Sequence, residues 1–264
     1  MMRFALCISY DGTQFKGWQT QVNQRTIQTE LELAISKVAA HPVSVVTAGR
    51  TDTAVHATGQ IVHFESDSQR SLEAWKLGVN RFLPSDIRVI WSSKVTENFH
   101  ARFSATRRSY RYIIYNSSVK HALLRNHVSA CYQPLDIDRM KQAAIHFIGE
   151  MDFSTIRAAG CQAKTATRNI DQLDIHSRGS WVWFDVSANA FLQHMVRNIA
   201  GMLIEVGLGE REPAWVKEVL LLKDRTKAGV TALPNGLYLS NIEYDAKFRL
   251  PKSPPRITFW HEYE

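Results

Sequence analysis

The feature that most constrains this chain is a polar, glycine-containing segment with one carboxylate, enclosed by two runs of β-branched and apolar residues. The segment covers residues 48–60, and its carboxylate is Asp52. The runs before and after it, residues 43–47 and 61–64, are typical of strands. The sequence therefore predicts a loop fixed at both ends by a sheet, which is a rigid position for chemistry.

Two interpretations of Asp52 follow from this loop. The guanidinium of Arg50, two residues away, would keep the carboxylate ionised if the two groups meet. Aspartate also commonly caps a turn by accepting hydrogen bonds from its own backbone. On the loop alone, turn capping is favoured by about two to one.

Composition narrows the class of protein. The 264 residues are 45% hydrophobic, enough for one large domain or two small ones, and the net charge of +7 favours a polyanionic partner such as nucleic acid. The widely spaced Cys7, Cys131 and Cys161 indicate a reducing compartment and no disulfide framework. The N-terminal residues lack a signal-peptide pattern, and no segment approaches the length of a membrane span. We therefore expect a cytoplasmic protein with no membrane contact.

The first half of the chain predicts the order β-α-β-β-α-β. Strands are expected over residues 3–10, 43–47, 61–64 and 87–91. One helix begins after Thr26 and another at Ser71, each with apolar residues at helical spacing. The apolar faces are expected to consist of Ile27, Leu31, Ala34, Ile35 and Val38 in the first helix and Leu72, Trp75, Val79 and Phe82 in the second.

The second half again mixes strands with helices. Its expected elements are a strand over 109–115, a helix capped by Asp136, a hairpin of 170–176 and 181–188, helices over 193–206 and from Pro213, and a strand over 237–244. We predict an α+β protein in which two similar subdomains share a mostly antiparallel sheet flanked by helices. The expected boundaries are 1–104 for the N-terminal subdomain, 105–250 for the C-terminal one and 251–264 for an extended tail.

Arg197 lies in a helical segment that is apolar on most of its circumference. Burying an arginine there would cost several kcal/mol, roughly, unless it is paired. One alternative places Arg197 on a polar stripe that faces water, and another pairs it locally with Glu205. The functional interpretation pairs it with a carboxylate from elsewhere in the chain, and Asp52 is the candidate.

Tyr110 belongs to a run of arginines and tyrosines over residues 107–112. Such a strand is most often ordinary half-buried sheet. It also suits nucleic-acid binding, with a ring on which a base stacks and cations for the phosphates. The number of arginines nearby favours nucleic-acid binding.

Several common chemistries lack their motifs. The sequence contains no glycine-rich loop for a nucleoside triphosphate or a dinucleotide and no nucleophile elbow. The histidines and cysteines have no zinc spacing, so we expect no metal, and we interpret His121 and His127 as structural or surface residues. No second carboxylate pairs obviously with Asp52, which argues against a glycosidase.

Several motifs together identify a family. Nine short segments resemble motifs of the tRNA pseudouridine synthase A family. They are residues 10–12, 17–19, 48–52, 55–57, 59–60, 99–106, 110–112, 193–199 and 236–239. The resemblance covers nearly the whole chain and is highly specific. One departure is Ala54, where the family usually has glycine, with an unusual Thr53 before it. If position 54 has a positive φ angle, Ala54 carries a conformational cost there.

The resemblance implies a cofactor-free isomerase that acts on uridines at positions 38, 39 and 40 of the tRNA anticodon arm, works as a homodimer and has an RNA-binding cleft between its subdomains. Asp52 would be the nucleophile, attacking either the uracil ring or the ribose carbon. Arg197 would hold it ionised, with Arg50 as a second candidate cation. Tyr110 would stack on the base and take part in proton movement. Substrate binding is assigned to Tyr110, Arg50, Leu237 and His56.

Two alternatives from other classes stay open at this point. A non-catalytic RNA-binding protein would use the same basic surface, and a nucleoside hydrolase or glycosylase would release free uracil. The combination of Asp52, Arg197 and Tyr110 favours the synthase, because a protein that only binds anionic RNA has no use for a buried carboxylate facing it.

Overall fold

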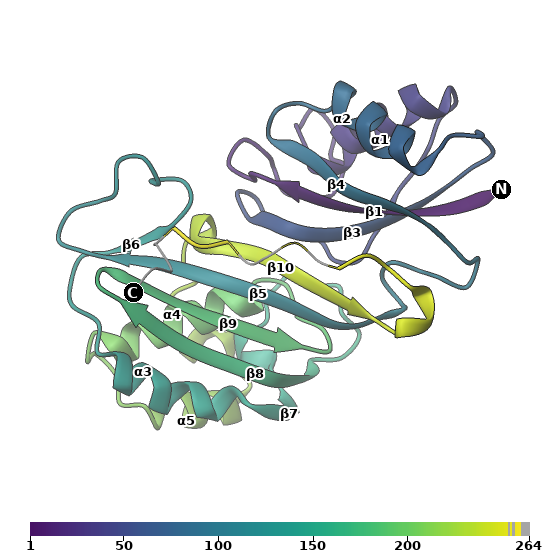
Figure 1. The fold of residues 1–264 in the computed structure, drawn as a ribbon. Helices are drawn as coiled ribbons and strands as arrows, with labels where there is room; N and C mark the ends of the chain where they lie inside the picture. The colour runs from purple at the N-terminus through teal and green to yellow at the C-terminus, as the bar shows by residue number, and fades with distance from the viewer. Residues whose placement is uncertain (253, 255–256, 260–264) are drawn as a thin grey trace. The chain divides into compact units, whose positions relative to one another are not determined.

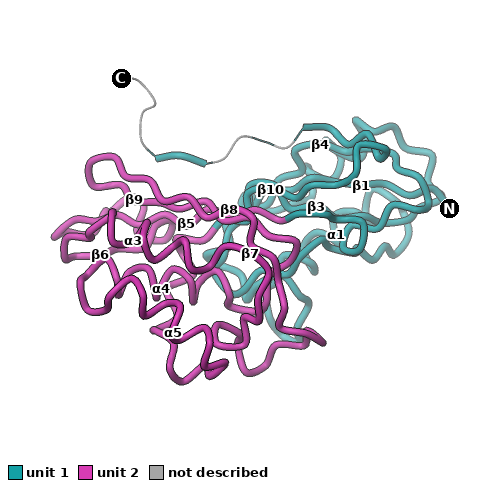
Figure 2. The backbone as a smooth tube through the Cα atoms, turned by 90° about the horizontal axis from the view of Figure 1, so that it is seen from below, with its two compact units in different colours: residues 1–107, 238–259 teal, residues 108–237, 260–264 magenta. Residues whose placement is uncertain are grey.

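The computed structural model describes residues 1–252, 254 and 257–259. The chain forms two compact units, coloured separately in Figure 2. Unit 1 comprises Met1–Arg107 and the described part of Tyr238–Phe259, and unit 2 comprises Arg108–Leu237. Residues 238–250, grouped with the second half by the sequence analysis, therefore lie in the first unit.

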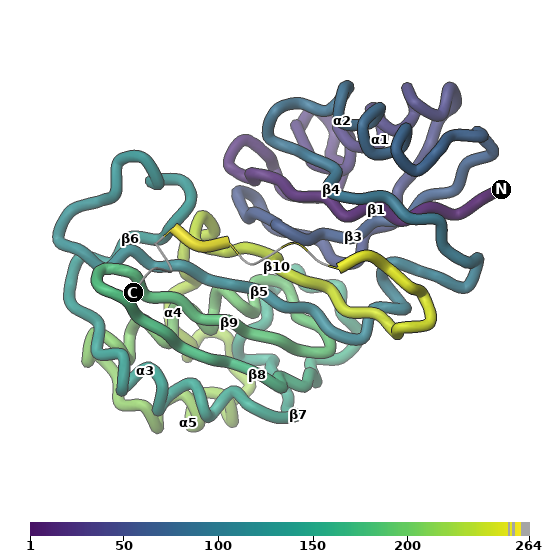
Figure 3. The backbone as a smooth tube through the Cα atoms, in the orientation of Figure 1, coloured from purple at the N-terminus to yellow at the C-terminus, as the bar shows by residue number. Residues whose placement is uncertain are grey.

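The sheet of unit 1 is built around β3 (His56–Ser66). β1 (Met2–Tyr10) pairs with it antiparallel and also with β4 (Ile87–Val95). On the other side of β3 lies β10 (Leu237–Tyr244), which is parallel to it, with Tyr238 opposite His56. Figure 3 shows this last strand, in yellow-green, beside a strand from the first quarter of the chain.

Two helical segments cover the sheet of unit 1 (Figure 1). α1 (Ile27–Ala39) begins at Thr26, whose side chain accepts from the Thr29 N–H, and all five residues expected on its apolar face are buried. The second segment is a π-helical turn (Ala74–Gly78) followed by α2 (Val79–Phe82).

The apolar face predicted for the second helix is half wrong. Trp75 and Val79 are buried, but Leu72 and Phe82 are exposed. The π turn takes more residues per turn than an α-helix, so the expected spacing no longer places these side chains on one face.

The strands of unit 2 also pair mostly antiparallel. β9 (Trp181–Ala188) pairs antiparallel with β5 (Ala105–Asn116) and with β8 (Thr167–Arg178), and β7 (Gly149–Asp152) pairs with β8. A short β6 (Ser129–Cys131) runs parallel to β5. The helices are α3 (Ile137–Ala144), capped by Asp136, α4 (Met195–Gly207) and α5 (Trp215–Leu222). In Figure 1 they lie on one side of these strands.

The predicted α+β class, with a mostly antiparallel sheet flanked by helices, is confirmed. Two expectations around residues 48–60 need correction. The strand before the loop is only β2 (Val46–Thr47), and the strand after it begins at His56, so the last residues of the predicted loop are sheet. The predicted tail lies partly outside the described residues. No helix among the described residues has the length and apolar character to cross a membrane.

His63 on β3 makes the stability of unit 1 depend on pH. Burial, reinforced by the charges of His100 and Arg3, lowers its pKa from 6.5 to about 4, and its Nδ1 accepts from the Ala101 N–H at 3.1 Å. Between these pH values the unfolded chain binds a proton that the folded chain does not. We therefore expect His63 to lower the free energy of unfolding by about 3 kcal/mol as the pH falls from 7 to 4.

Urea unfolding at several pH values tests this expectation. His63→Gln removes the titration and keeps an acceptor for the Ala101 N–H. The wild type should lose about 3 kcal/mol more than this variant over the same range. Parallel pH curves for the two proteins would contradict it.

Candidate active site

Asp52 lies half-buried in the loop between β2 and β3. The two ends of the loop are fixed: the Ala48 N–H donates to the Ile61 carbonyl at 2.9 Å, and the Gln60 side chain donates to the Gly49 carbonyl at 2.6 Å. The loop that carries the carboxylate is therefore held by strand residues at both ends, as predicted.

The segment that follows β1 holds the other side of this loop. The Trp18 N–H donates to the Thr51 carbonyl at 3.0 Å, and the Ala54 N–H donates to the Phe15 carbonyl at 3.3 Å. The Tyr10 hydroxyl lies 2.8 Å from the Thr51 hydroxyl. Residues on both sides of Asp52 are thus tied to the start of the chain, which fixes the direction of the carboxylate.

Two glycines allow this close approach. A Cβ at position 12 would lie 2.0 Å from the Val55 carbonyl oxygen, and one at Gly17, which has φ +85°, would lie 2.8 Å from the Thr51 carbonyl oxygen. Only glycine fits either position. The sequence analysis did not assign this role to the opening segment, although both glycines belong to motifs that carry the resemblance.

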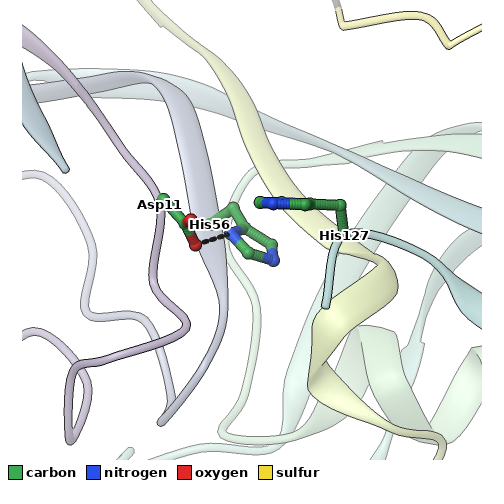
Figure 4. A group of neighbouring side chains, drawn as sticks. All are labelled: Asp11, His56 and His127. Atoms are coloured by element: carbon green, nitrogen blue, oxygen red, sulfur yellow. Dashed lines mark ion pairs between the residues drawn. The ribbon is translucent and has the colours of Figure 1, made fainter. Parts of the chain in front are cut away.

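His56 fixes the same opening segment from β3. It is 1% exposed, its Nδ1 accepts from the Gly12 N–H at 3.1 Å, and its ring stacks on Tyr238 with centroids 4.7 Å apart. The Asp11 carboxylate points at this ring, 3.2 Å from Nδ1 (Figure 4). Burial raises the pKa of Asp11, but the contact with the His56 ring and the hydrogen bonds from Thr13 outweigh this effect and hold the pKa below its usual range. These contacts make His56 a positioning residue for the loop.

Ala54 has φ 61°, so the conformational cost expected from the sequence is present. Ala54→Gly removes the clash between Cβ and the following backbone, and part of the gain is offset by the greater freedom of glycine in the unfolded chain. We expect a stabilisation of about 1 kcal/mol. Urea unfolding of the variant and the wild type measures this difference in the free energy of unfolding.

A matched control exists at Ala40, the C-cap of α1, which also has φ 61° and lies outside the loop. Ala40→Gly should stabilise the protein by a similar amount. A54G that is less stable than the wild type would show that the Ala54 methyl group makes favourable contacts that outweigh the strain.

The remaining predicted residues divide between the units. Arg50 is exposed on the Asp52 loop, in unit 1 with Asp52 and His56. Tyr110, Arg197 and Leu237 lie in unit 2.

Tyr110 and Leu237 provide apolar surface in unit 2. Tyr110 lies on β5 opposite Val186, is 9% exposed, and meets the ring of Phe191 edge-on at 5.1 Å. Leu237, the first residue of β10, is buried. It follows Gly236, where a Cβ would lie 2.5 Å from the Ile113 carbonyl oxygen on β5.

Arg197 lies in the first turn of α4, half-buried. Its Nε donates to the Ala232 carbonyl at 2.9 Å, and the Ala232 N–H donates back to the Arg197 carbonyl at 3.1 Å. One turn on, a Cβ at Gly201 would lie 1.8 Å from the Val230 carbonyl oxygen. The chain before β10 is therefore pressed onto α4 and orients the guanidinium.

The charge of Arg197 also acts on β5. Burial raises the pKa of the Tyr112 hydroxyl, and the hydrogen bond with Ser129 and the charge of Arg197 oppose that rise. Glu205, the local partner considered for Arg197, accepts from the Val230 N–H at 2.9 Å and pairs with Arg211.

The class of protein, an RNA-modifying isomerase of the pseudouridine synthase class, follows from comparison with known families and not from the positions of these residues alone. The chain belongs to the tRNA pseudouridine synthase family, whose family model matches residues 6–104 and 143–245. The resemblance stated from the sequence motifs is therefore confirmed.

Individual relatives agree with this assignment. The chain is 53% identical to a tRNA pseudouridine synthase A of Shewanella woodyi, over 95% of this chain and 96% of that protein. It is 50% identical to the protein of that name from Coxiella burnetii, over 96% and 97% of the two chains. Among solved structures, the archaeal box H/ACA sRNP Nop10-Cbf5 complex aligns over 76% of this chain and 43% of that chain, with a TM-score of 0.36 and 11% identity, too distant to add to the assignment.

Proposed function

We propose that this chain isomerises uridine to pseudouridine at positions 38, 39 and 40 of the tRNA anticodon arm, with Asp52 as the nucleophile. Membership of the tRNA pseudouridine synthase family supports the reaction and the substrate class. The observation that carries the role of Asp52 is its position: a carboxylate half-buried in a loop held by β3 on one side and by the opening segment on the other.

The reaction balances without a cofactor. The Asp52 carboxylate attacks either the ribose C1′ or the uracil ring, and the bond between N1 and C1′ breaks. The base turns, C5 forms the new bond to C1′, and the bond to Asp52 breaks, which restores the free carboxylate. C5 then loses its proton while N1 gains one, so substrate and product contain the same atoms and the same number of electrons.

Arg197 supplies the cation that this step requires. A carboxylate attacks only when it is ionised, and a guanidinium nearby favours the ionised form. The Ala232 carbonyl and the start of α4 fix the Arg197 side chain, so little entropy is lost in presenting it. Arg50, on the same loop as Asp52, is the second candidate.

Tyr110, Leu237 and His56 are proposed to shape the substrate site. The ring of Tyr110 suits stacking on the flipped uracil and is placed to take part in proton movement, and Leu237 offers an apolar surface against the base. His56 contributes indirectly, by holding Asp11 and Gly12 against the loop.

A target uridine within a stem must be flipped out, at a cost of roughly a few kcal/mol. Contacts between the basic protein and RNA phosphates offset this cost. We propose a homodimer, in which one RNA contacts both subunits. We place the protein in the cytoplasm, an assignment supported by its cysteines, which are free wherever the structure describes them.

Mapping of pseudouridine at each anticodon-arm uridine after treatment of tRNA with the protein tests the proposal. We expect modification at positions 38, 39 and 40 and no free uracil. Modification confined to other positions would contradict the proposed specificity, release of uracil would indicate a glycosylase, and unmodified tRNA that remains bound would indicate an RNA-binding protein.

A further inference from the structure

Two arginines meet in unit 2, outside the residues assigned to the reaction. Arg157 follows a 3-10 turn (Ser154–Ile156), and Arg168 lies near the start of β8. Both side chains bind the same loop, because Arg157 donates to the carbonyls of Cys161 and Ala163 and Arg168 donates to the Thr165 carbonyl. Burial lowers the pKa of Arg168, Cys161 opposes this, and the charge of Arg157 lowers the pKa further. We refer to Arg157 and Arg168 as the arginine pair.

Each member of the pair is held by backbone carbonyls. Nη2 of Arg157 donates to the carbonyls of Cys161 and Ala163, both at 2.7 Å. Nη1 of Arg168 donates to the Thr165 carbonyl at 3.1 Å and to the Thr167 carbonyl at 2.6 Å, while its Nε is buried and makes no hydrogen bond. Among the described residues, neither guanidinium pairs with a carboxylate.

This arrangement is unfavourable without an anion. Two like charges repel, the more so where they are partly buried and poorly screened. Burial raises the pKa of the Cys161 thiol, but hydrogen bonds with the backbone of Gln193 and Ala163 and with the Arg157 side chain bring it below its ordinary value. The exposed Lys164 adds a third positive charge to the same loop.

The arginine pair is tied to the start of α4. The Ala158 N–H donates to the Gln193 carbonyl at 3.1 Å, and the Asn198 side chain donates to the Ile156 carbonyl at 2.8 Å. These bonds bracket Arg197 in sequence. A group bound at the arginine pair would therefore lie at a fixed distance from Arg197, which belongs to the same unit.

We propose that the arginine pair, with Lys164, binds a phosphodiester group of the tRNA backbone and so sets the position of the RNA strand along α4. The inference rests on tRNA being the substrate. Guanidinium groups match phosphate oxygens in geometry and charge, and a double positive charge without an internal carboxylate suits a polyanion. Free inorganic phosphate has the same chemistry, and the experiment separates the two.

The test uses the full chain and unmodified tRNA at several salt concentrations. Arg168→Gln should weaken tRNA binding by about tenfold and reduce the slope of log K against log salt by about 1, as expected for one lost phosphate contact. Arg168→Lys keeps the charge and should restore most of the affinity. Lys217→Gln, on the exposed face of α5 in the same unit, is the matched control and should leave both quantities unchanged.

Three outcomes would overturn the inference. In the first, R168Q binds tRNA with the affinity and salt slope of the wild type. In the second, R168Q loses affinity for tRNA and R168K does not restore it. In the third, R168Q changes only the stabilisation by inorganic phosphate and leaves tRNA binding unchanged. The proposed function is judged separately, by pseudouridine formation in the wild type. Normal product with normal R168Q binding rejects only the phosphate site, whereas absent product with weakened R168Q binding rejects only the reaction.

Discussion

Asp52→Asn is expected to lower pseudouridine formation by at least about 1,000-fold while tRNA binding stays within about twofold of the wild type. The amide has nearly the shape of the carboxylate but is not a nucleophile. Removing a negative charge that faces RNA also does not weaken binding. Single-turnover formation of pseudouridine and a separate binding measurement distinguish the two effects.

The control for this variant is Asp67→Asn, which removes an exposed carboxylate in the same unit that pairs only weakly, with the N-terminal amine. It should leave turnover unchanged. Substantial activity in D52N would exclude Asp52 as the nucleophile, and equal losses of binding and activity would assign it a structural role.

Gly201→Ala is the second change with a large expected effect. The new Cβ would lie 1.8 Å from the Val230 carbonyl oxygen, a backbone atom, so the segment packed on α4 must move. We expect a destabilisation of about 3 kcal/mol, typical of overpacking. Because Ala232 in that segment accepts from Arg197, the rate should fall even in the molecules that remain folded.

Gly209→Ala provides the comparison. Gly209 has φ +75° and open space around it, so its alanine variant suffers backbone strain alone, about 1 kcal/mol. Urea unfolding and single-turnover rates of the two variants separate packing from strain. If G201A loses no more stability than G209A and keeps the wild-type rate, the segment before β10 does not orient Arg197.

Much of the secondary structure could be predicted because its signals are local. The spacing of apolar residues gave the buried face of α1, and the strand predicted over residues 237–244 has the observed bounds of β10, Leu237–Tyr244. The helix expected from Ser71 failed in part, because a π turn at Ala74–Gly78 shifts which side chains face the core.

The sequence indicates which residues are candidates for the site, but it does not indicate the contacts that hold them in place. Asp52 stands out as the carboxylate of a loop between strands, and Arg197 as a charge in an apolar helix. The contacts of Gly12 and Gly17 with the loop join segments about 40 residues apart, and no periodicity signals such contacts. The hydrogen bond from the Arg197 side chain to the Ala232 carbonyl likewise depends on how the chain folds back onto α4.

The parallel pairing of β10 with β3 has a consequence during synthesis of the chain. His56, which holds the opening segment against the Asp52 loop, is stacked on Tyr238, so this buried ring gains its neighbour only after Tyr238 has been made. A nascent chain on the ribosome carries the Asp52 loop early but lacks the strand that completes its surroundings. The contacts that hold this loop are therefore complete only after β10 has been made.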